Sequence, residues 1–250
     1  MAVKEKTSEL VIQKLTVGRA SVWIKGASPF LYNAMSAKVK GQLLLPSPKK
    51  TKADKEQSMK HEPLQEYRDS VYQHQTSHRG KTRLYIPSTM IKAAMCNAAL
   101  EIPGTSKAQV GRLIWVEGDT IDMYGIPQIF CQVTRSADMN RTPDVRTRAI
   151  LPEWCCKVTI NFTAPTINEV TLGRLLETAG LLMGIGDFRQ QKGKGSYGQF
   201  CTADEDECDE IVKASTKAAQ DDALQDPAYY DLETKQLLEW FKEERKNRGK

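Results

Sequence analysis

The order of strand and helix patterns along the 250-residue sequence predicts an α+β fold. Segments with apolar residues at every second position alternate with two segments whose apolar residues recur at helical spacing. When the insertions are left out, the order of the predicted elements is strand, helix, strand, strand, helix, strand. This is the split β-α-β arrangement of a ferredoxin-like fold. We therefore expect a β-α-β-β-α-β core in which two helices cover one face of a four-stranded antiparallel sheet.

The first core elements lie in the N-terminal half of the chain. Residues 15–26 alternate apolar and polar side chains on either side of Gly18, which predicts a strand with a bulge at the glycine. Residues 85–104 predict a short strand and then a helix that Ser88 caps. The next strand is expected in residues 111–118.

The other core elements lie between residues 126 and 203. Strands are expected in residues 126–134, 157–162 and 196–203. Residues 166–184 carry the clearest helix pattern, because Thr166 and Glu169 have capping-box spacing and a glycine stands at the end.

Two basic insertions and an acidic tail are expected around this core. Residues 47–83 contain nine basic and five acidic residues, with a short helix in their second half, and residues 119–150 contain an arginine-rich loop. We expect one domain over residues 1–201, then an acidic linker and a helix around residues 234–245 within residues 202–250.

Charge is distributed unevenly along the chain. Residues 1–200 carry 28 Lys and Arg against 17 Asp and Glu, whereas residues 201–250 carry 8 against 14. A basic body attracts polyanions, and nucleic acid is the commonest polyanion in a cytoplasm. A solvated basic surface without a ligand explains the charge equally well.

Several other classes of protein do not fit the composition. No apolar run approaches the roughly 18 to 20 residues that span a bilayer, and the polar N-terminus resembles neither a secretory signal nor a transit peptide. The six cysteines form no C-x-x-C pair and have no histidines at ligand spacing. We expect a cytoplasmic protein with no membrane partner, no metal and no cofactor.

Residues 184–200, GIGDFRQQKGKGSYGQF, combine glycines, cations and aromatic rings. Gly193, Gly195 and Gly198 match G-x-G-x-x-G, but a dinucleotide site needs a strand before the motif and a helix after it, and here that order is reversed. Glycine amides bind anions, cations attract phosphates and aromatic rings stack on bases. The stretch favours a nucleic-acid contact. The alternative is that the glycines only permit a tight connection between helix and strand.

Three segments resemble the repeat-associated mysterious protein (RAMP) superfamily of class 1 CRISPR systems: VWIKGASPFL, IPSTMIKAAMCNAAL and LLETAGLLMGIGDFRQQKGKGSYGQF. The last is the most specific, because it has Gly-x-Gly-x-x-Arg followed by Tyr-Gly before a strand. The resemblance implies a modified RNA-recognition (RRM) fold that binds single-stranded RNA. It implies either a guide-RNA backbone subunit of an antiviral ribonucleoprotein, which self-associates or joins other effector subunits, or a stand-alone, phage-encoded relative that binds another RNA such as mRNA.

The glycine-rich stretch and the two insertions supply the RNA-binding residues that we predict. They are Gly184, Gly186, Arg189, Lys192, Gly193, Lys194, Gly195 and Tyr197 in the stretch, Arg135, Arg141, Arg146 and Arg148 in the second insertion, and Lys49, Lys50, Lys52 and Lys55 in the first.

An enzyme is an alternative to a binding protein. RNA cleavage without metal usually needs histidine, and His61, His74 and His78 all lie in the first insertion. His74 and His78 are four positions apart but lack the glutamate of H-E-x-x-H. We expect exposed, RNA-facing histidines, with a metal-independent endoribonuclease that uses His74 or His78 as the alternative. A third alternative is an interaction protein whose terminal helix recruits a partner.

Overall fold

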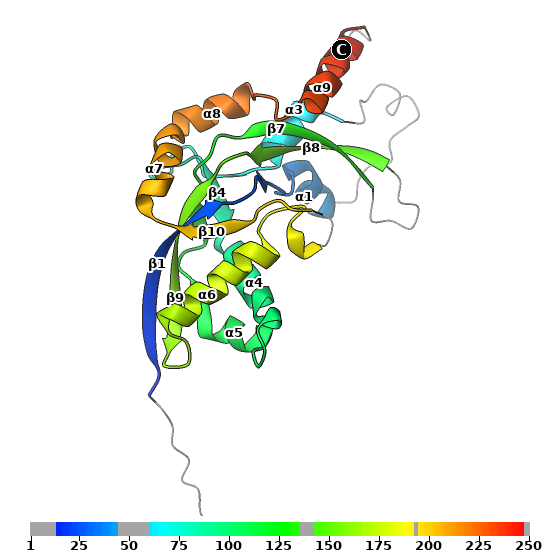
Figure 1. Cartoon of the computed structure of the whole chain (residues 1–250). Helices are drawn as coiled ribbons and strands as arrows, with labels where there is room; N and C mark the ends of the chain where they lie inside the picture. Colours follow the sequence, from blue (N-terminus) through cyan, green and yellow to red (C-terminus); the bar gives the residue numbers. More distant parts are fainter. Residues whose placement is uncertain (1–13, 45–60, 136–142, 193–194, 248–250) are drawn as a thin grey trace, which may run out of the picture.

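The computed structural model describes residues 14–44, 61–135, 143–192 and 195–247. In these residues the strands form three antiparallel sheets with helices packed around them (Figure 1). The fold is mixed α+β, as the sequence predicts. Within the described ranges, no helix has both the length and the apolar character needed to cross a membrane.

The largest sheet has four strands in the order β10-β1-β9-β5. They are β1 (Thr16–Gly26), β5 (Ile114–Val116), β9 (Cys155–Ala164) and β10 (Phe200–Ala203). β1 pairs with β9 without interruption, so the bulge expected at Gly18 is absent from this ladder. A Cβ atom on Gly18 would lie 2.3 Å from the ring of Phe162, and this close approach explains the glycine.

Helices α4 (Ser88–Ala98) and α6 (Glu169–Thr178) pack on this sheet and against each other. Both helices lie where the sequence predicts them, but their first turns differ from the prediction. Pro87 rather than Ser88 precedes α4 as the N-cap residue, without a side-chain hydrogen bond. The side chain of Asn168, rather than Thr166, accepts a hydrogen bond from the Thr171 amide at the start of α6.

Two three-stranded sheets complete the body. One has the order β2-β8-β7, with β2 (Phe30–Leu31), β8 (Pro143–Leu151) and β7 (Gln128–Arg135); the other has the order β3-β4-β6, with β3 (Tyr72–Gln73), β4 (Leu84–Pro87) and β6 (Thr120–Asp122). β8 pairs with β7 along almost its whole length, so the second half of the expected arginine-rich loop is a strand. Arg146 and Arg148 alternate with the buried Thr147 and Ala149, so they occupy one face of a strand and do not mark a loop. β7 corresponds to the strand expected in residues 126–134, but it pairs in this sheet and not in the largest one.

The remaining helices before the C-terminal tail are short. They are α1 (Ala37–Leu44), α3 (Pro63–Asp69), η1 (Ala99–Glu101), α5 (Lys107–Leu113), the π-helical turn η2 (Ala179–Met183) and η3 (Gln190–Lys192). α3 confirms the helix expected in the first insertion, and its Tyr67 is fully buried. α5 lies in a segment for which the sequence predicted no helix.

The C-terminal tail consists of α7 (Glu205–Ala214), α8 (Lys217–Gln225) and α9 (Leu232–Asn247). α9 confirms the terminal helix, but the segment read as an acidic linker is helical, because Asp204 and Glu207 form a capping box. The fully buried Gln220 fastens α8 to the body with four hydrogen bonds to backbone atoms of Arg83, Leu84, Met123 and Gly125.

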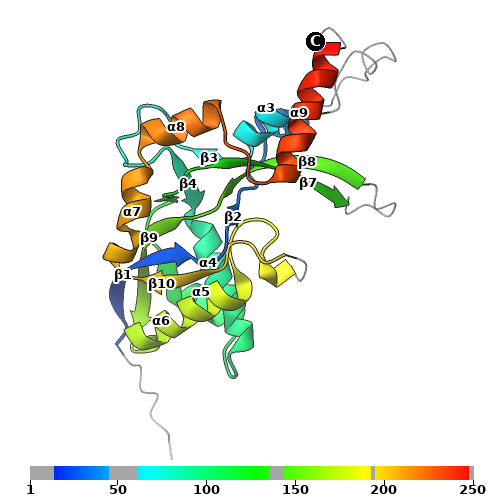
Figure 2. The same cartoon turned by 45° about the horizontal axis from the view of Figure 1, so that its top comes forward.

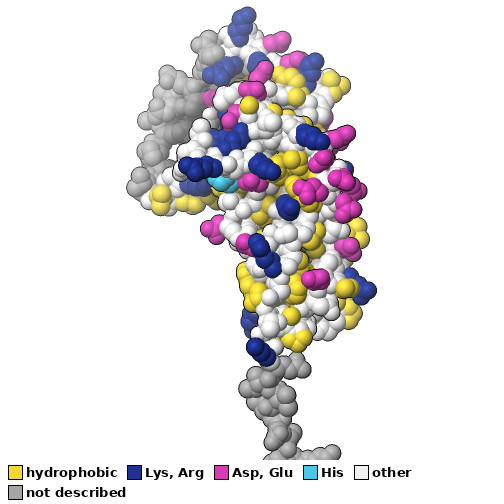
Figure 3. Space-filling model, turned by 90° about the vertical axis from the view of Figure 1, so that its left-hand side faces the viewer, with side chains coloured by type: hydrophobic (Ala, Val, Ile, Leu, Met, Phe, Trp, Pro, Cys, Tyr) yellow, Lys and Arg dark blue, Asp and Glu magenta, His cyan; other side chains and the backbone are white. Residues whose placement is uncertain are grey.

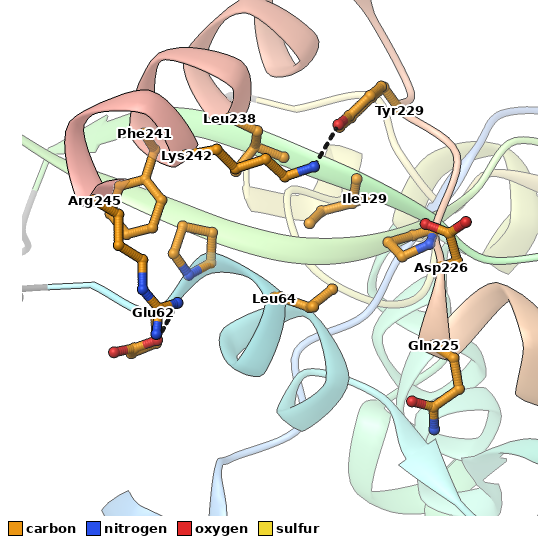
Figure 4. Close-up of a pocket in the computed structure, with 12 residues that line it drawn as sticks. Glu62, Leu64, Ile129, Gln225, Asp226, Tyr229, Leu238, Phe241, Lys242 and Arg245 are labelled. Atoms are coloured by element: carbon orange, nitrogen blue, oxygen red, sulfur yellow. Dashed lines mark hydrogen bonds and ion pairs between the residues drawn. The ribbon is translucent and has the colours of Figure 1, made fainter. Parts of the chain in front are cut away.

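Figure 2 shows α7 and α8 lying along the body and the end of α9 projecting from it. The first half of α9 packs on β7, where Thr234 and Leu238 are buried. Figure 4 shows the pocket that residues of α9 line together with Leu64 of α3 and Ile129 of β7.

Candidate nucleic-acid interface

The glycine-rich stretch, residues 184–200, folds back on itself between η2 and β10. Gly184 ends the π-helical turn with a left-handed φ of 65°, and its amide donates to the Ala179 carbonyl oxygen at 2.9 Å. The chain then runs out and returns, so that the Ile185 amide donates to the Gly198 carbonyl oxygen at 2.9 Å. The described residues of the stretch thus form a structured connection between helix and strand.

Close approach of backbone atoms explains the glycines on the returning arm. A Cβ atom on Gly198 would lie 1.8 Å from the Ile185 carbonyl oxygen, and one on Gly195 would lie 1.7 Å from the Phe188 carbonyl oxygen. Gly198 also has a φ of 72°, which side chains disfavour. Both positions therefore exclude a side chain.

The outgoing arm carries a third tight glycine. A Cβ atom on Gly186, whose φ is 83°, would lie 2.7 Å from the Leu31 carbonyl oxygen. The amides of Gly184 and Gly198 donate to the carbonyl oxygens of Ala179 and Pro29, so neither amide is open to a phosphate in this structure. The anion contacts expected from these two amides are therefore not available in this fold.

Arg189 and Lys192 are the described cations of the stretch. The Arg189 guanidinium donates to the Gly186 carbonyl oxygen at 3.0 Å and to the Gln191 amide oxygen at 3.1 Å, so neutral partners hold it. Lys192 is exposed in η3. Within the described ranges neither cation forms an ion pair with a carboxylate, so both charges are available to an anion.

Asp187 joins the stretch to the β7–β8 hairpin. Its carboxylate forms an ion pair with Arg148 of β8, and its amide donates to the Leu31 carbonyl oxygen of β2 at 2.9 Å. Burial, together with the nearby Arg146 charge, lowers the pKa of Arg148 to about 10. Because Asp187 neutralises Arg148, this arginine positions the stretch on the hairpin and offers less charge to RNA than the sequence predicts.

The hairpin separates the predicted arginines onto two faces. Side chains alternate between the faces of a strand, and residues directly opposite each other share a face. Arg148 pairs with Phe130, and Arg146 lies two positions away on β8, so all three share the face that meets the stretch. Arg135 is five positions from Phe130 on β7 and lies on the opposite face.

Aromatic and polar side chains line a small hollow between this face and the stretch. The lining residues are Leu31, Phe130, Gln132, Thr134, Arg146, Arg148 and Phe188. Phe188 has a φ of 49°, a backbone conformation that residues other than glycine rarely adopt. Tyr197 packs edge-on against Phe130 with ring centroids 6.2 Å apart, and burial raises its pKa. Phe188 and Tyr197 are both half-buried, so part of each ring remains accessible to a base.

On its other side the stretch forms a cleft of about 290 Å³ with α4. Its lining residues are Asn33, Thr89, Met90, Ala93, Ala94, Asn97, Gly184, Ile185, Gly186, Arg189 and Gln191. No carboxylate is among these described residues, whereas amides, a hydroxyl and a guanidinium are. We call this space the α4 cleft. It suits a phosphate or the polar edge of a nucleotide.

Reasoning from sequence missed the α4 cleft residues that come from outside the stretch. Asn33, Thr89 and Asn97 carry no charge and lie next to apolar core positions, so nothing in composition marks them. The segments that resemble the RAMP superfamily contain Thr89 and Asn97, and that was the available signal.

Seven predicted RNA-binding residues lie outside the described residues. They are Lys49, Lys50, Lys52, Lys55, Arg141, Gly193 and Lys194. Their part in RNA binding stays a prediction.

The three histidines line neither the α4 cleft nor the hairpin hollow. His74 is only 9% exposed, so the expectation of an exposed histidine is wrong there. Burial lowers the pKa of His74, against the opposing effect of its hydrogen bond to Asp122. His61 bridges Glu66 and Asp144 at 2.8 and 2.9 Å.

The side of the molecule that carries β1, α7 and α8 is not a continuous basic surface. In Figure 3, Lys and Arg side chains are scattered among Asp and Glu, and the acidic ones gather along one edge. Some cations of this side have carboxylate partners, whereas Arg189 and Lys192 have none among the described residues. Arg19 and Lys213, for example, are paired with Glu117 and Asp209.

Comparison with known proteins finds weak similarity to a solved structure and no match to a family model or a curated protein. A chain from the cryo-EM structure of the type III-B Cmr-beta bound to cognate target RNA is similar at 13% identity with a TM-score of 0.37. The match covers 76% of this chain and 60% of that chain, so it leaves a large part of the other chain's length unmatched. A TM-score of this size does not establish a shared fold.

Proposed function

We propose that the protein binds single-stranded RNA across the glycine-rich stretch. The observation that carries the proposal is the position of Arg189 and Lys192, which lack ion-pair partners among the described residues and lie on a stretch between the α4 cleft and the hairpin hollow. In this proposal the cations attract the phosphates, and bases stack on the half-buried aromatic residues Phe188 and Tyr197.

The strand order supports a ferredoxin-like, RRM-type core for this function. β1, α4, β5, β9, α6 and β10 follow one another in the order that the sequence predicts, and β1 lies between β10 and β9 in the sheet. The three RAMP-like segments support a further step, in which the RNA is a guide RNA and the chain is a backbone subunit of a CRISPR-type ribonucleoprotein or its stand-alone relative. Such a subunit would associate with copies of itself or with other subunits along the RNA.

The chemistry of this interface predicts binding with little sequence preference. Cations contact phosphates, which every nucleotide has, and aromatic rings stack on any base. Each phosphate contact on a single strand contributes about 0.7 to the slope of log affinity against log salt. Contacts from Arg146, Arg189 and Lys192 should therefore supply about 2 of that slope.

The test is fluorescence anisotropy with a labelled oligouridine at several salt concentrations. Replacing Arg146, Arg189 and Lys192 together by alanine should weaken binding about tenfold or more at low salt and reduce the salt slope by about 2. The matched control replaces three cations of the β1, β9 and α7 side, Arg19, Lys157 and Lys213, and should leave the slope nearly unchanged.

Two outcomes would change the proposal. Equal losses in both triple variants would mean that overall charge, rather than this interface, attracts RNA. Equal affinity for the corresponding single-stranded DNA would replace RNA by single-stranded nucleic acid in general, because the 2′-hydroxyl would then make no contribution.

A further inference from the structure

The chain between β3 and β4 brings two histidines close to an aspartate of another strand. His74 follows β3, His78 lies four residues later, and Asp122 is the last residue of β6. The Nε2 atoms of His74 and His78 lie 3.0 and 4.0 Å from Asp122 Oδ1. One ligand atom from each of the three residues lies within 4.8 Å of the other two.

We propose that His74, His78 and Asp122 bind a divalent first-row transition metal ion, best matched by Zn²⁺. Two imidazole nitrogens and a carboxylate oxygen form a ligand set found in zinc sites that leave a fourth position to water or an anionic oxygen. Bonds of about 2.0 to 2.2 Å to a tetrahedral ion place the ligand atoms roughly 3.4 Å apart. This spacing falls between the two distances of 3.0 and 4.0 Å in the structure.

Gly80 keeps the space beside these ligand atoms open. A Cβ atom at this position would lie 2.2 Å from His78 Nε2 and 3.2 Å from Asp122 Oδ2. Gly80 does not have a left-handed φ, so backbone conformation does not require a glycine there. A Cβ atom would instead push the His78 ring away from its present position beside the Asp122 carboxylate.

Metal binding requires one histidine ring to turn. The two rings are stacked, with centroids 3.7 Å apart and planes 11° apart. The lone pair of an imidazole nitrogen lies in the ring plane, so two parallel rings cannot both point at one ion. His78 is the ring that can move, because its side chain is 38% exposed, whereas that of His74 is 8% exposed and packs against Tyr85.

Neighbouring cations limit the affinity of this site. Lys217 of α8 donates to the His78 carbonyl oxygen, and Arg83 donates to the His74 carbonyl oxygen. Their positive charges oppose a bound cation, so we expect weaker binding than at a four-ligand structural zinc site. A bound ion would fasten the β3–β4 connection, which Lys217 already holds to α8, onto β6.

Isothermal titration with Zn²⁺ tests the proposal. The titrated protein carries Cys201→Ser, because an exposed thiol such as that of Cys201 is a potential zinc ligand outside the proposed site. One ion per chain should bind and raise the melting temperature. With Co²⁺ as the probe, the visible spectrum should show nitrogen and oxygen ligands without a thiolate band.

Three substitutions in the same background separate this site from other zinc binding. His78→Gln should weaken Zn²⁺ binding at least tenfold, because even the loss of an outer partner of a ligand typically costs 10–100-fold. Gly80→Ala should weaken it while all three ligands remain. His61→Gln is the control. His61 also contacts two carboxylates, but Glu66 lies at Nδ1 and Asp144 at Nε2, so His61 and both carboxylates cannot bind the same ion.

The outcomes are distinct from those of the RNA experiment. Circular dichroism verifies that each variant is folded; the substituted His78 is partly exposed, so folding should persist. Absence of stoichiometric Zn²⁺ binding to the Cys201→Ser protein would overturn the site, and so would binding that His78→Gln leaves unchanged.

Discussion

The glycine-rich stretch and the acidic tail have opposite compositions, yet both are held to the body by buried contacts. The stretch is held because its glycines let carbonyl oxygens approach closely, and α8 is held because Gln220 reaches four backbone atoms. They differ in what they leave exposed. The stretch presents Arg189 and Lys192, whereas α7 presents carboxylates. Composition thus predicts the charge that a segment exposes but not the contacts that hold it.

The largest expected effect comes from filling a tight glycine position in the stretch. Gly198→Ala should destabilise the protein by about 4 kcal/mol, because the new Cβ meets the Ile185 carbonyl oxygen and the backbone has a positive φ. Thermal or urea unfolding measures the loss. Gly173→Ala in α6 is the control: no atom lies within 4 Å of its Cβ position, so it should stabilise by about 0.5 to 1 kcal/mol. Equal effects would mean that the turn is not tightly packed.

The corresponding test of the tail removes its buried anchor. Gln220→Ala should destabilise the protein by about 3 kcal/mol, because it leaves buried backbone donors and acceptors without partners. Urea unfolding measures this. Gln225→Ala, at the exposed end of the same helix, should cost less than about 0.5 kcal/mol. An unchanged midpoint for Gln220→Ala would show that α8 is not docked in solution.

A smaller effect should separate RNA binding from stability within the stretch. Phe188→Gly should weaken oligouridine binding by about 1 kcal/mol, roughly fivefold, because a stacking ring is lost. Its effect on stability should be slight, since glycine relieves the positive φ of this residue while apolar contacts are lost. Anisotropy and thermal unfolding of one preparation check both. Unchanged affinity would exclude Phe188 from the interface.

The smallest expected effect compares the two faces of the hairpin. Arg146→Ala should lower the salt slope by about 0.7, whereas Arg135→Ala should lower it less, because Arg135 lies on the face away from the stretch. Salt titrations of the two single variants measure this difference. If Arg135→Ala has the larger effect, RNA follows the other face of the hairpin.

Long, regular elements of the fold could be predicted because their patterns are local. The alternation in β1 and the leucine stripe of α6 occur within one segment of sequence. β2 and β3 are only two residues long, so their pairing depends on distant partners that no local pattern reveals. The α+β class is confirmed, while the ferredoxin-like core stays a proposal that the strand order supports.

The same distinction between local patterns and distant pairings applies to the candidate sites. Arg189 and Lys192 could be found from sequence because charge and glycines occur together. The pairing of Arg148 with Asp187 could not be, since it joins two segments through the fold. Likewise, the expectation of no metal site rested on local spacing. Asp122, which stands beside His74 and His78, comes from a different strand.

Ultraviolet cross-linking of the protein to oligouridine, followed by mass spectrometry of the linked peptides, tests the RNA interface most directly. We expect cross-links in residues 184–200, at Phe188 or Tyr197, and in the β7–β8 hairpin. Cross-links confined to the β1, α7 and α8 side, with none in the glycine-rich stretch, would contradict the account.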